Sequence, residues 1–341
     1  MDAAHSPTEK DPTQSVLITH KAFNDAYAAI QECHDSYGNR AQPLCKVLSG
    51  PSGTGKSTII KTFEKKHPTA EGPHGSEHTF LTVTVPPQAT IRSFAEEFLT
   101  VFKDPYPTRG SAADLGRRID KALGRGDGGH SVRVVVLQEA QRFADSQFIA
   151  LWDLGNFLRE RIETSGSSFV LSGLEYTDDV VDCNEQLQRL FGPTIRLKAF
   201  DGTVANERTE FRAFLSNLKT KLSGAYDFPD IASPELAFRF HYASYGLIGY
   251  LMEIIRGAAD LARAQKTRAI TMSLLAKSYQ ARIRQKDARN CNPFTITDFC
   301  PDNAPLQLSP HEEAAAKRAA INGRKRRKVA PRLSAKNSDG I

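Results

Sequence analysis

The stretch that decides the fold is a glycine-rich loop, Gly50-Pro51-Ser52-Gly53-Thr54-Gly55-Lys56-Ser57-Thr58. The apolar run Leu44-Cys45-Lys46-Val47-Leu48 precedes it, and a helical pattern over Thr58–Phe63 follows it. Glycines at this spacing let backbone N–H groups turn inward and cradle phosphates, while the lysine reaches the outer phosphate oxygens and the serine hydroxyl ligates Mg²⁺. The alternative is an ordinary glycine-rich turn, which does not require a strand before it and a helix after it. The pattern predicts a Walker A loop that binds ATP, with Ser57 as a metal ligand.

The chain around this loop alternates between apolar runs and helical patterns. Five short runs rich in β-branched residues predict strands at Pro43–Ser49, Thr79–Val85, Val132–Leu137, Ser168–Ser172 and Thr194–Ala199. Helical patterns between them cover Ile91–Phe102, Ala112–Leu123 and Gln147–Ile162. Alternation of this kind is typical of a mostly parallel sheet covered by helices on both faces. We therefore expect an α/β fold with a five-stranded sheet.

The pattern becomes purely helical after Phe200, which indicates a second, smaller domain. Helices are predicted over Glu207–Leu222, Pro234–Phe240, Leu247–Ala264 and Thr271–Gln285. The expected domains are an N-terminal extension and helix (1–40), a nucleotide-binding α/β domain (41–203), a helical lid (204–290), and a linker with a basic tail (291–341). Within the extension we expect a disordered start over residues 1–15 and a helix over Val16–Cys33. Within the largely disordered tail we expect a helix only across Glu312–Ala320.

Charge and cysteine content restrict the class of protein. The residues after 310 hold nine Lys and Arg against three Asp and Glu, so the tail carries the whole net charge of +6. The five cysteines are odd in number and form no CxxC pair, which favours a reducing compartment over a disulfide frame or a zinc site. The N-terminus has no apolar signal region, and no run is long enough to span a membrane. We expect a cytoplasmic protein without a membrane partner.

A second acidic site is expected at the end of another buried strand, because a P-loop needs a group to hold the Mg²⁺ shell and orient the attacking water. The strand Val132–Leu137 is followed by Gln138-Glu139-Ala140-Gln141, which fits a Walker B segment. Glu139 occupies the position of the catalytic base. Gln138 stands where an aspartate is usual and is the second expected metal ligand. The alternative is a buried strand that ends in a solvated polar pair.

Two further side chains are candidates for the catalytic machinery. Ser172 ends the strand Ser168–Ser172 and is placed to touch the γ-phosphate or the water, although a serine there also serves as a strand-end cap. Arg189 is a candidate arginine finger that reaches the γ-phosphate of a neighbouring subunit. Arg159 and Arg161 are weaker candidates for that role. A solvated surface charge is the alternative for each arginine.

These residues together resemble a family, the AAA+ transposition proteins of the TniB/TnsC type, which are relatives of MuB. The resemblance covers residues 16 to 295 and rests on GPSGTGKST, QEAQRF, VLSGLEYT, NEQLQRLF and ASYGLIGYLMEIIRGAADLA. Asn292-Pro293-Phe294 is also similar to the family. The sequence departs from the pattern at Gln138 and at Tyr250, where an arginine would act as a second nucleotide sensor.

The resemblance implies a function and a set of partners. Members of the family bind ATP and Mg²⁺, assemble as a ring or helical filament on double-stranded DNA, and act with a transposase and a target-selector protein. They hold DNA phosphates with residues between the second and third strands. In this chain that region offers Arg92, Lys103, Arg109, Arg117 and Arg118. A solvated face shared with Glu96 and Glu97 is the alternative, and the basic run Arg324–Lys328 is a further arm for DNA or a partner.

Two other classes of P-loop protein share parts of this pattern. An initiator or STAND-type signalling ATPase has the same sheet and lid, but it is expected to carry a winged helix or sensor repeats, for which this sequence offers no segment. A small-molecule kinase would use its arginines to hold a phosphoryl acceptor. Glu139 after a Walker B strand and the long helical second domain argue against the kinase. The expected function is therefore an ATPase that marks target DNA for a transposase, with slow hydrolysis because of Gln138.

Overall fold

The computed structural model describes residues 11–68, 70–72, 75–77, 79–124, 131–146, 150–283, 291–302, 304 and 309–329. Their contacts divide the chain into two units, Met1–Cys300 and Pro301–Ile341. None of the helices in this described part is long and apolar enough to cross a membrane.

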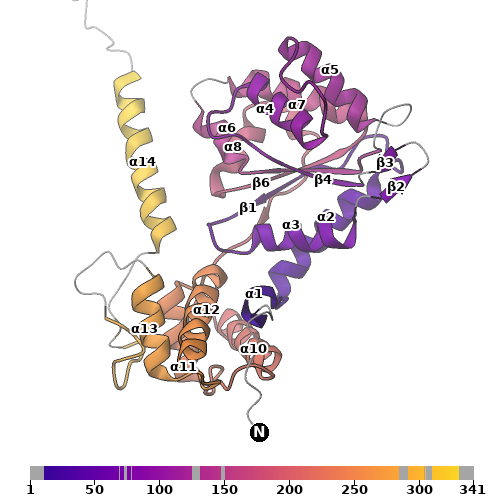
Figure 1. Ribbon diagram of the computed structural model, residues 1–341. Helices are drawn as coiled ribbons and strands as arrows, with labels where there is room; N and C mark the ends of the chain where they lie inside the picture. The colour runs from indigo at the N-terminus through magenta and orange to yellow at the C-terminus, as the bar shows by residue number, and fades with distance from the viewer. Residues whose placement is uncertain are drawn as a thin grey trace, which may run out of the picture. The chain divides into compact units, whose positions relative to one another are not determined.

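A five-stranded sheet forms the centre of the first unit (Figure 1). Its strands are β1 (Lys46–Ser49), β4 (Phe80–Thr84), β5 (Val134–Gln138), β6 (Ser168–Gly173) and β7 (Ile195–Arg196). They lie in the order β4-β5-β6-β1-β7, and every neighbouring pair is parallel. The central strands are buried on both faces, as their continuous apolar runs require. The predicted α/β class and five-stranded sheet are confirmed.

Helices cover both faces of the sheet (Figure 1). The helices α2 (Lys21–Ser36) and α3 (Lys56–Lys66) lie on one face, where Ile30, Ile59 and Phe63 pack against inward residues of the strands. The other face carries α4 (Ile91–Val101), α5 (Ala112–Leu123), α6 (Gln141–Asp145), α7 (Leu151–Ser165), α8 (Asp178–Asp182) and α9 (Glu185–Gln188). The apolar periodicity of the longer helices explains this arrangement, because each presents one stripe to the sheet.

Four helices after the sheet enclose a separate apolar cluster. They are α10 (Ala205–Leu222), α11 (Pro234–Ser244), α12 (Ile248–Ala264) and α13 (Met272–Arg282). In α12 the buried Leu251, Ile254 and Ile255 recur at helical spacing and pack toward α11 and α13. The helical character of this region matches the sequence pattern, while the exact domain boundaries stay predictions.

The structure corrects the prediction that residues 1–15 are disordered. Residues 1–10 lie outside the described part, but α1 (Pro12–Ser15) is a short helix that packs against α12. The Asp11 side chain accepts a hydrogen bond from the Thr13 backbone N–H and is bonded to Arg263. This cap and ion pair fix a segment that composition alone marked as polar and loose.

Two other local predictions are incomplete or wrong. The strands β2 (Ala70–Gly72) and β3 (Gly75–Glu77) form an antiparallel pair that the sequence analysis did not anticipate. In the second unit, α14 covers Pro310–Val329, so a helix includes the basic run that was expected to be disordered. Alanine, lysine and arginine favour helix, which explains its extension beyond Ala320. Residues 147–149 of the predicted Gln147–Ile162 helix lie outside the described part, and α7 begins at Leu151.

Candidate nucleotide-binding site

The sheet order brings the predicted site residues to one edge. Strand β6 lies between β1 and β5, and Ser172 is in register with Leu48 on one side and Gln138 on the other. In a parallel sheet all carboxyl ends meet at the same edge, where ligands of open α/β sheets bind. The loop after β1, the segment after β5 and the end of β6 therefore face one another.

The loop Gly50–Gly55 has a backbone that only glycine adopts easily at several positions. Gly50 (φ +154°), Gly53 (φ +87°) and Gly55 (φ +97°) all have positive φ. A Cβ at Gly50 would collide with the Leu197 carbonyl oxygen at the end of the neighbouring strand β7. Gly55 is the N-cap of α3, so the loop delivers free backbone N–H groups and the positive end of the helix to one place.

Lys56 is folded over this loop. Its Nζ donates hydrogen bonds to the carbonyl oxygens of Gly50 (2.7 Å) and Pro51 (2.8 Å). Burial lowers the pKa of Lys56 to about 8, although the carboxylates of Glu139 and Glu175 oppose the shift. A nearby anion stabilises the charged form of a desolvated cation, which suits the predicted contact of Lys56 with phosphate.

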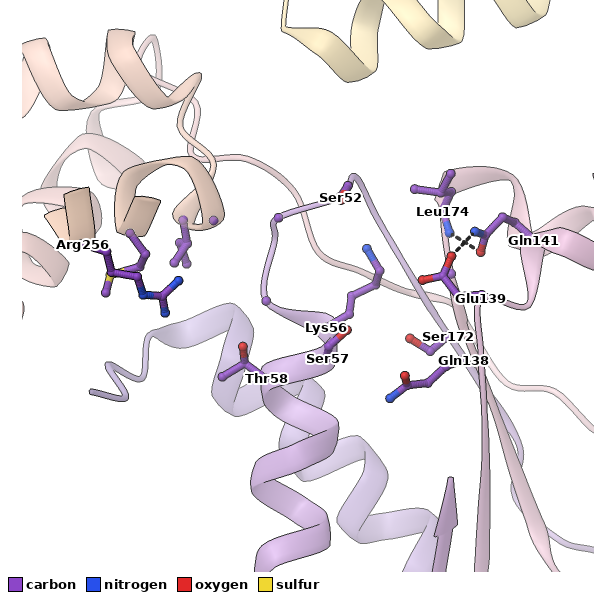
Figure 2. A pocket seen from close by; sticks show the side chains of 16 residues that line it. Ser52, Lys56, Ser57, Thr58, Gln138, Glu139, Gln141, Ser172, Leu174 and Arg256 are labelled. Carbon is purple, nitrogen blue, oxygen red and sulfur yellow. Dashed lines mark hydrogen bonds between the residues drawn. The ribbon is translucent and has the colours of Figure 1, made fainter. Parts of the chain in front are cut away.

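Glu139 is held in an uncommon conformation directly after β5. Its φ is +57°, in the left-handed region that costs energy for a residue with a side chain. Its Oε2 accepts a hydrogen bond of 2.8 Å from Gln141 Nε2, and Arg142 lies 3.9 Å away. Figure 2 shows Glu139, Gln138 and Ser172 across the site from Lys56. Strain of this kind is typical of functional positions, so the geometry supports the assignment of Glu139 as the base.

Gln141 links this carboxylate to the end of β6. Its Oε1 accepts a hydrogen bond of 3.2 Å from the Leu174 backbone N–H while its Nε2 holds Glu139. A Cβ at Gly173 would collide with Gln141 Oε1 and with Thr177 Oγ1, so only glycine allows this close packing. The sequence analysis missed Gln141, because its role depends on a turn that brings it back toward the neighbouring strand.

The residues at this edge surround a cavity of about 400 Å³. The sheet side contributes the loop after β1, Gln138, Glu139, Gln141 and the end of β6, and helix α12 contributes Ile248, Gly249, Met252 and Arg256. The Gly249 backbone N–H donates a hydrogen bond of 2.8 Å to the Gly53 carbonyl oxygen, which joins α12 directly to the loop. Gly249 and Arg256 were also missed as site residues, because only the tertiary packing of α12 brings them here.

The donor atoms at the edge of the sheet fit Mg²⁺. Ser57 supplies a hydroxyl oxygen, Gln138 an amide oxygen and Glu139 a carboxylate, and all three residues line the cavity. Mg²⁺ prefers oxygen ligands and usually keeps several waters and substrate phosphates in its shell. A bound Mg²⁺ would neutralise phosphate charge, so no larger set of protein carboxylates is required here.

The candidate arginine fingers lie in different environments. The Arg189 side chain, at the C-cap of α9, is 76% exposed and forms an ion pair of 3.2 Å with Glu185 at the start of that helix. Arg161 is buried and bonded to both carboxylate oxygens of Asp120. Arg159 pairs with Glu163 at 3.6 Å. Because Arg161 is buried and paired, it has a structural role and is no longer a candidate for the arginine finger. Arg189 is exposed and can contact a second subunit.

The five candidate DNA contacts surround the loop between α4 and α5. Arg92 donates to the Thr108 and Gly110 carbonyl oxygens, both at 2.8 Å, and Arg118 binds Asp104 and the Tyr106 and Arg109 carbonyl oxygens. These two arginines hold the loop in shape. Arg118 is half-buried, whereas Arg92 is exposed although it is bonded to the loop. The other three are exposed too: Lys103 has a φ of +56°, Arg109 lies over the Tyr106 ring, and Arg117 pairs with Asp114.

Several solved structures are similar to this chain, at low sequence identity. The ORC2 protein of Aeropyrum pernix, solved as ADPNP–ADP complexes, has 16% identity and a TM-score of 0.57 over 77% of this chain and 68% of that one. Cdc6p from Pyrobaculum aerophilum has 14% identity and a TM-score of 0.56 over 81% and 70%. The A. pernix ORC1 protein, solved in complex with DNA, has 14% identity and a TM-score of 0.55 over 77% and 66%. These likenesses show the fold, which is that of the AAA+ P-loop ATPases.

Sequence comparison gives the family. No curated protein matches the chain significantly. The model of the family described as "Bacterial TniB protein" matches residues 11–200, which include the glycine-rich loop, the Gln138-Glu139 segment and Ser172. The match spans more than half of the chain. This protein belongs to the TniB family.

Proposed function

We propose that this protein is an ATP-dependent, DNA-binding transposition protein that assembles on target DNA and recruits or activates a transposase. The observation that carries the proposal is the meeting of the loop Gly50–Thr58, Glu139 and Ser172 around one cavity, in a chain of the TniB family. That geometry supports a nucleotide switch. The family supports transposition as the process that the switch controls.

The site residues have distinct roles in this proposal. Lys56 and the N–H groups of the loop hold the phosphates, and Ser57 and Gln138 hold Mg²⁺. Glu139 orients the attacking water, while Ser172 contacts the γ-phosphate or that water. A neutral amide at Gln138 brings less negative charge to the metal than aspartate does, so hydrolysis is slow and the ATP-bound assembly is long-lived.

Assembly requires a contact between subunits, and Arg189 is the candidate that the structure leaves exposed. Among the residues that the structure describes, its guanidinium pairs only with Glu185, the first residue of α9, and Arg189 itself is the C-cap of that helix. Such surface ion pairs contribute little free energy, so a γ-phosphate from a second subunit would displace Glu185 easily. Arg189→Ala should therefore weaken ATP-dependent assembly while leaving ATP binding to the monomer unchanged.

DNA binding is assigned to the loop Lys103–Gly110. Lys103 and Arg109 are exposed there, and Arg92 and Arg118 hold the backbone that carries them. Contacts of this type neutralise phosphates without distinguishing bases, so binding is sequence-tolerant and salt-sensitive. The basic part of α14 adds a second, non-specific contribution, and removal of residues 311–341 should weaken binding but keep its ATP dependence.

Fluorescence anisotropy with unrelated duplexes, with and without a non-hydrolysable ATP analogue, tests DNA binding. We expect much tighter binding with the analogue than without it. The double variant Lys103→Gln/Arg109→Gln should lower the slope of log affinity against log salt by about 1.8, at about 0.9 for each lost phosphate contact. Lys277→Gln is the matched control, because Lys277 is an exposed lysine on α13 in the helical part. An unchanged slope in the double variant would reject this loop as the DNA contact.

Electron microscopy and sedimentation test assembly and recruitment. With duplex DNA and the analogue we expect rings or helical filaments, and none for Lys56→Ala. A transposase encoded beside the gene should sediment with the filaments and not with DNA alone. If filaments form but the transposase does not sediment with them, recruitment is refuted, whereas ATP-dependent assembly on DNA is not.

An initiator ATPase is the second candidate, because the similar solved structures are ORC and Cdc6 proteins. The two candidates differ in their choice of DNA. An initiator would prefer one origin sequence, whereas the transposition protein binds unrelated duplexes equally. A single strongly preferred sequence in the anisotropy assay would therefore favour the initiator.

A further inference from the structure

Arg256 is a second cation at the cavity, and it comes from the helical part of the chain. Within the described residues, the only positively charged side chains that line the cavity are Lys56 and Arg256. Arg256 follows Met252 by four residues on α12, so both lie on the helix face that also brings Gly249 to the loop. A nucleoside triphosphate carries several negative charges, and Lys56 alone does not balance them.

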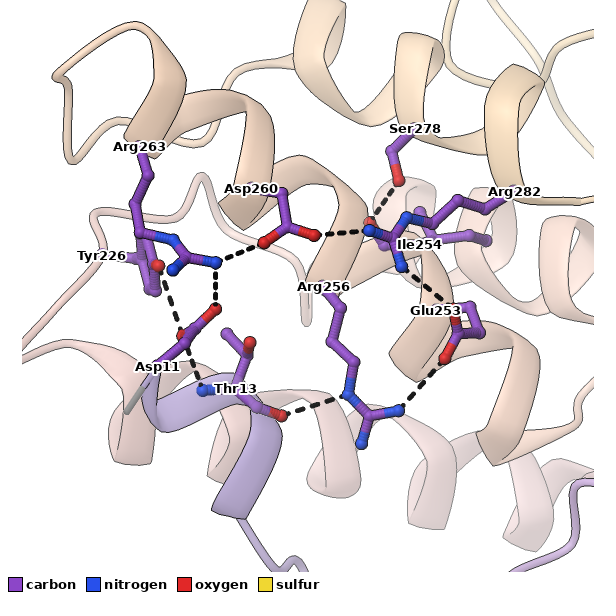
Figure 3. A network of polar contacts seen from close by, with 10 residues as sticks. All are labelled: Asp11, Thr13, Tyr226, Glu253, Ile254, Arg256, Asp260, Arg263, Ser278 and Arg282. Atoms are coloured by element: carbon purple, nitrogen blue, oxygen red, sulfur yellow. Dashed lines mark hydrogen bonds and ion pairs between the residues drawn. The ribbon is translucent and has the colours of Figure 1, made fainter. Parts of the chain in front are cut away.

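The guanidinium of Arg256 is oriented by two acceptors (Figure 3). Its Nε donates to the Thr13 carbonyl oxygen at 3.3 Å, and its Nη1 lies 3.2 Å from Glu253 Oε1. Glu253 Oε2 is 3.1 Å from Arg282 Nη1, so this carboxylate is shared between two arginines. Within the described part of the chain, Nη2 of Arg256 has no hydrogen-bond partner. Donors therefore remain for a ligand, since a guanidinium carries five N–H groups.

The network behind Arg256 keeps it in place. Asp260 bonds both Arg282 and Arg263, and Arg263 bonds Asp11 at the start of α1 (Figure 3). Asp11 is buried, accepts from the Thr13 N–H at 2.9 Å, and lies 3.3 Å from the Tyr226 hydroxyl. The Thr13 carbonyl that orients Arg256 thus belongs to a segment that is itself tied to α12.

The position of Arg256 identifies which end of the nucleotide it meets. In Figure 2, Arg256 lies on the Thr58 side of the loop, whereas Glu139 and Ser172 lie on the opposite side of Lys56. The γ-phosphate must face Glu139 for water to attack it, and Lys56 spans the β- and γ-phosphates. The remaining side, next to Thr58, receives the α-phosphate and the sugar.

We propose that Arg256 binds the α-phosphate end of the nucleotide, with Glu253 and the Thr13 carbonyl as its positioning groups. The inference rests on the proposed nucleotide binding and deepens it. ATP and ADP share the α-phosphate, so the contact strengthens binding of both by the same factor. Arg256 is therefore an anchor for either nucleotide and does not discriminate between them.

The test is isothermal titration of ATP and of ADP into the full chain and its variants. Arg256→Ala should weaken both nucleotides by at least about tenfold, the typical effect of one charge-assisted hydrogen bond, and Arg256→Lys should recover part of the loss. Lys277→Ala is the matched control, because Lys277 is an exposed cation on α13 that neither lines the cavity nor takes part in the ion pairs of this network. We expect both of its affinities to change by less than about twofold, and thermal melting identifies any variant that fails to fold.

Glu253→Gln tests the positioning role. It should weaken both nucleotides by less than Arg256→Ala does, and it should have no further effect once Arg256 is alanine. A purely structural Glu253 would instead lower the melting temperature and act independently of residue 256. Additive losses in the double variant would therefore overturn the positioning role.

The outcomes separate this inference from the proposed function. A loss confined to ATP would place Arg256 at the γ-phosphate and overturn the proposal, as would unchanged affinity for both nucleotides. Lys56→Ala is the reference variant. If Lys56→Ala abolishes binding while Arg256→Ala leaves both affinities unchanged, the nucleotide site is correct and only the role of Arg256 is wrong. If neither substitution lowers either affinity, the nucleotide site itself is refuted.

Discussion

Glu139 and Gln141 are joined by a hydrogen bond of 2.8 Å in which Gln141 Nε2 donates to the Glu139 carboxylate. The other end of the Gln141 amide accepts from the Leu174 N–H, so the carboxylate is tied to the end of β6. The expected base is thereby fixed relative to Ser172, two residues before Leu174 on the same strand end. A carboxylate that orients water must be held at a defined angle, and this amide provides the restraint.

Gln141 is therefore expected to affect turnover more than binding. Gln141→Met keeps the volume but removes both hydrogen bonds, and we expect kcat for ATP hydrolysis to fall about ten- to a hundredfold with little change in KM. Glu139→Gln should abolish hydrolysis and keep ATP-dependent assembly. Steady-state ATPase assays give both parameters, and Gln265→Met on the surface serves as control. A Glu139→Gln variant that hydrolyses ATP at the normal rate would show that β5 is not the Walker B strand.

Gln138 should set the Mg²⁺ requirement. An aspartate at the end of β5 would bring a negative charge next to the metal shell, whereas the amide of Gln138 offers only its carbonyl oxygen. We expect Gln138→Asp to lower the Mg²⁺ concentration at half-maximal ATPase activity or to raise the rate. Titration of Mg²⁺ at fixed ATP measures this, with Glu139→Gln as the inactive reference. Equal Mg²⁺ curves for Gln138→Asp and the unchanged protein would contradict a role of Gln138 at the metal.

The sequence predicted those parts of the site that depend on local chemistry. Glycine spacing encodes the loop Gly50–Thr58, and an apolar strand that ends in polar residues locates Glu139, so both could be found without a structure. The left-handed backbone conformation of Glu139 could not be predicted from the sequence, because nothing in a glutamate side chain requires it. The roles of Arg256 and Gly249 depend on how α12 packs. The sequence analysis looked for an arginine at Tyr250, six residues before the arginine that lines the cavity.

The same distinction applies to the fold. Alternating strand and helix patterns predicted the five strands, but not their order, since strand order is decided by which faces pack together. The Asp11–Arg263 ion pair that fixes α1 joins residues far apart in the chain, so composition wrongly marked that segment as disordered. Helix propensity alone would have predicted that α14 extends beyond Ala320. The prediction instead took the high positive charge of this run as a sign of disorder.

Gly249 is expected to tolerate no side chain. A Cβ there would lie 2.7 Å from the Gly53 Cα and 3.1 Å from the Gly53 carbonyl oxygen, both rigid backbone atoms. Gly249→Ala should therefore push α12 away from the loop, lower the free energy of unfolding by about 1–3 kcal/mol and weaken nucleotide binding. Gly224→Ala is the matched control, because a Cβ at Gly224 meets no atom within 4 Å. Denaturant unfolding and titration calorimetry measure the two effects, and equal behaviour of the two variants would reject the close contact.

The charge of Lys56 should make ATP binding depend on pH. Burial lowers the pKa of Lys56 to about 8 in the free protein, and bound phosphates favour the protonated form and so raise this pKa. Below pH 8 the ammonium is already charged and binding takes up no proton at this group. Above pH 8 the neutral amine must be protonated as ATP binds, so affinity falls as pH rises, by up to about tenfold per pH unit until the pKa of the complex is reached.

Titration calorimetry between pH 7 and 9.5, in buffers of different ionisation enthalpy, measures both the affinity and the proton uptake. The terminal phosphate of ATP resembles a phosphate monoester with a second pKa of about 6, so it is almost completely ionised over most of this range and contributes little. We expect uptake near zero at pH 7 that rises toward one proton at pH 9. Lys56→Arg keeps its charge throughout and should bind with a flat pH profile, provided that the longer side chain still reaches the phosphates. A flat profile for the unchanged protein would mean that Lys56 is fully charged over the whole range and is not desolvated in the free protein.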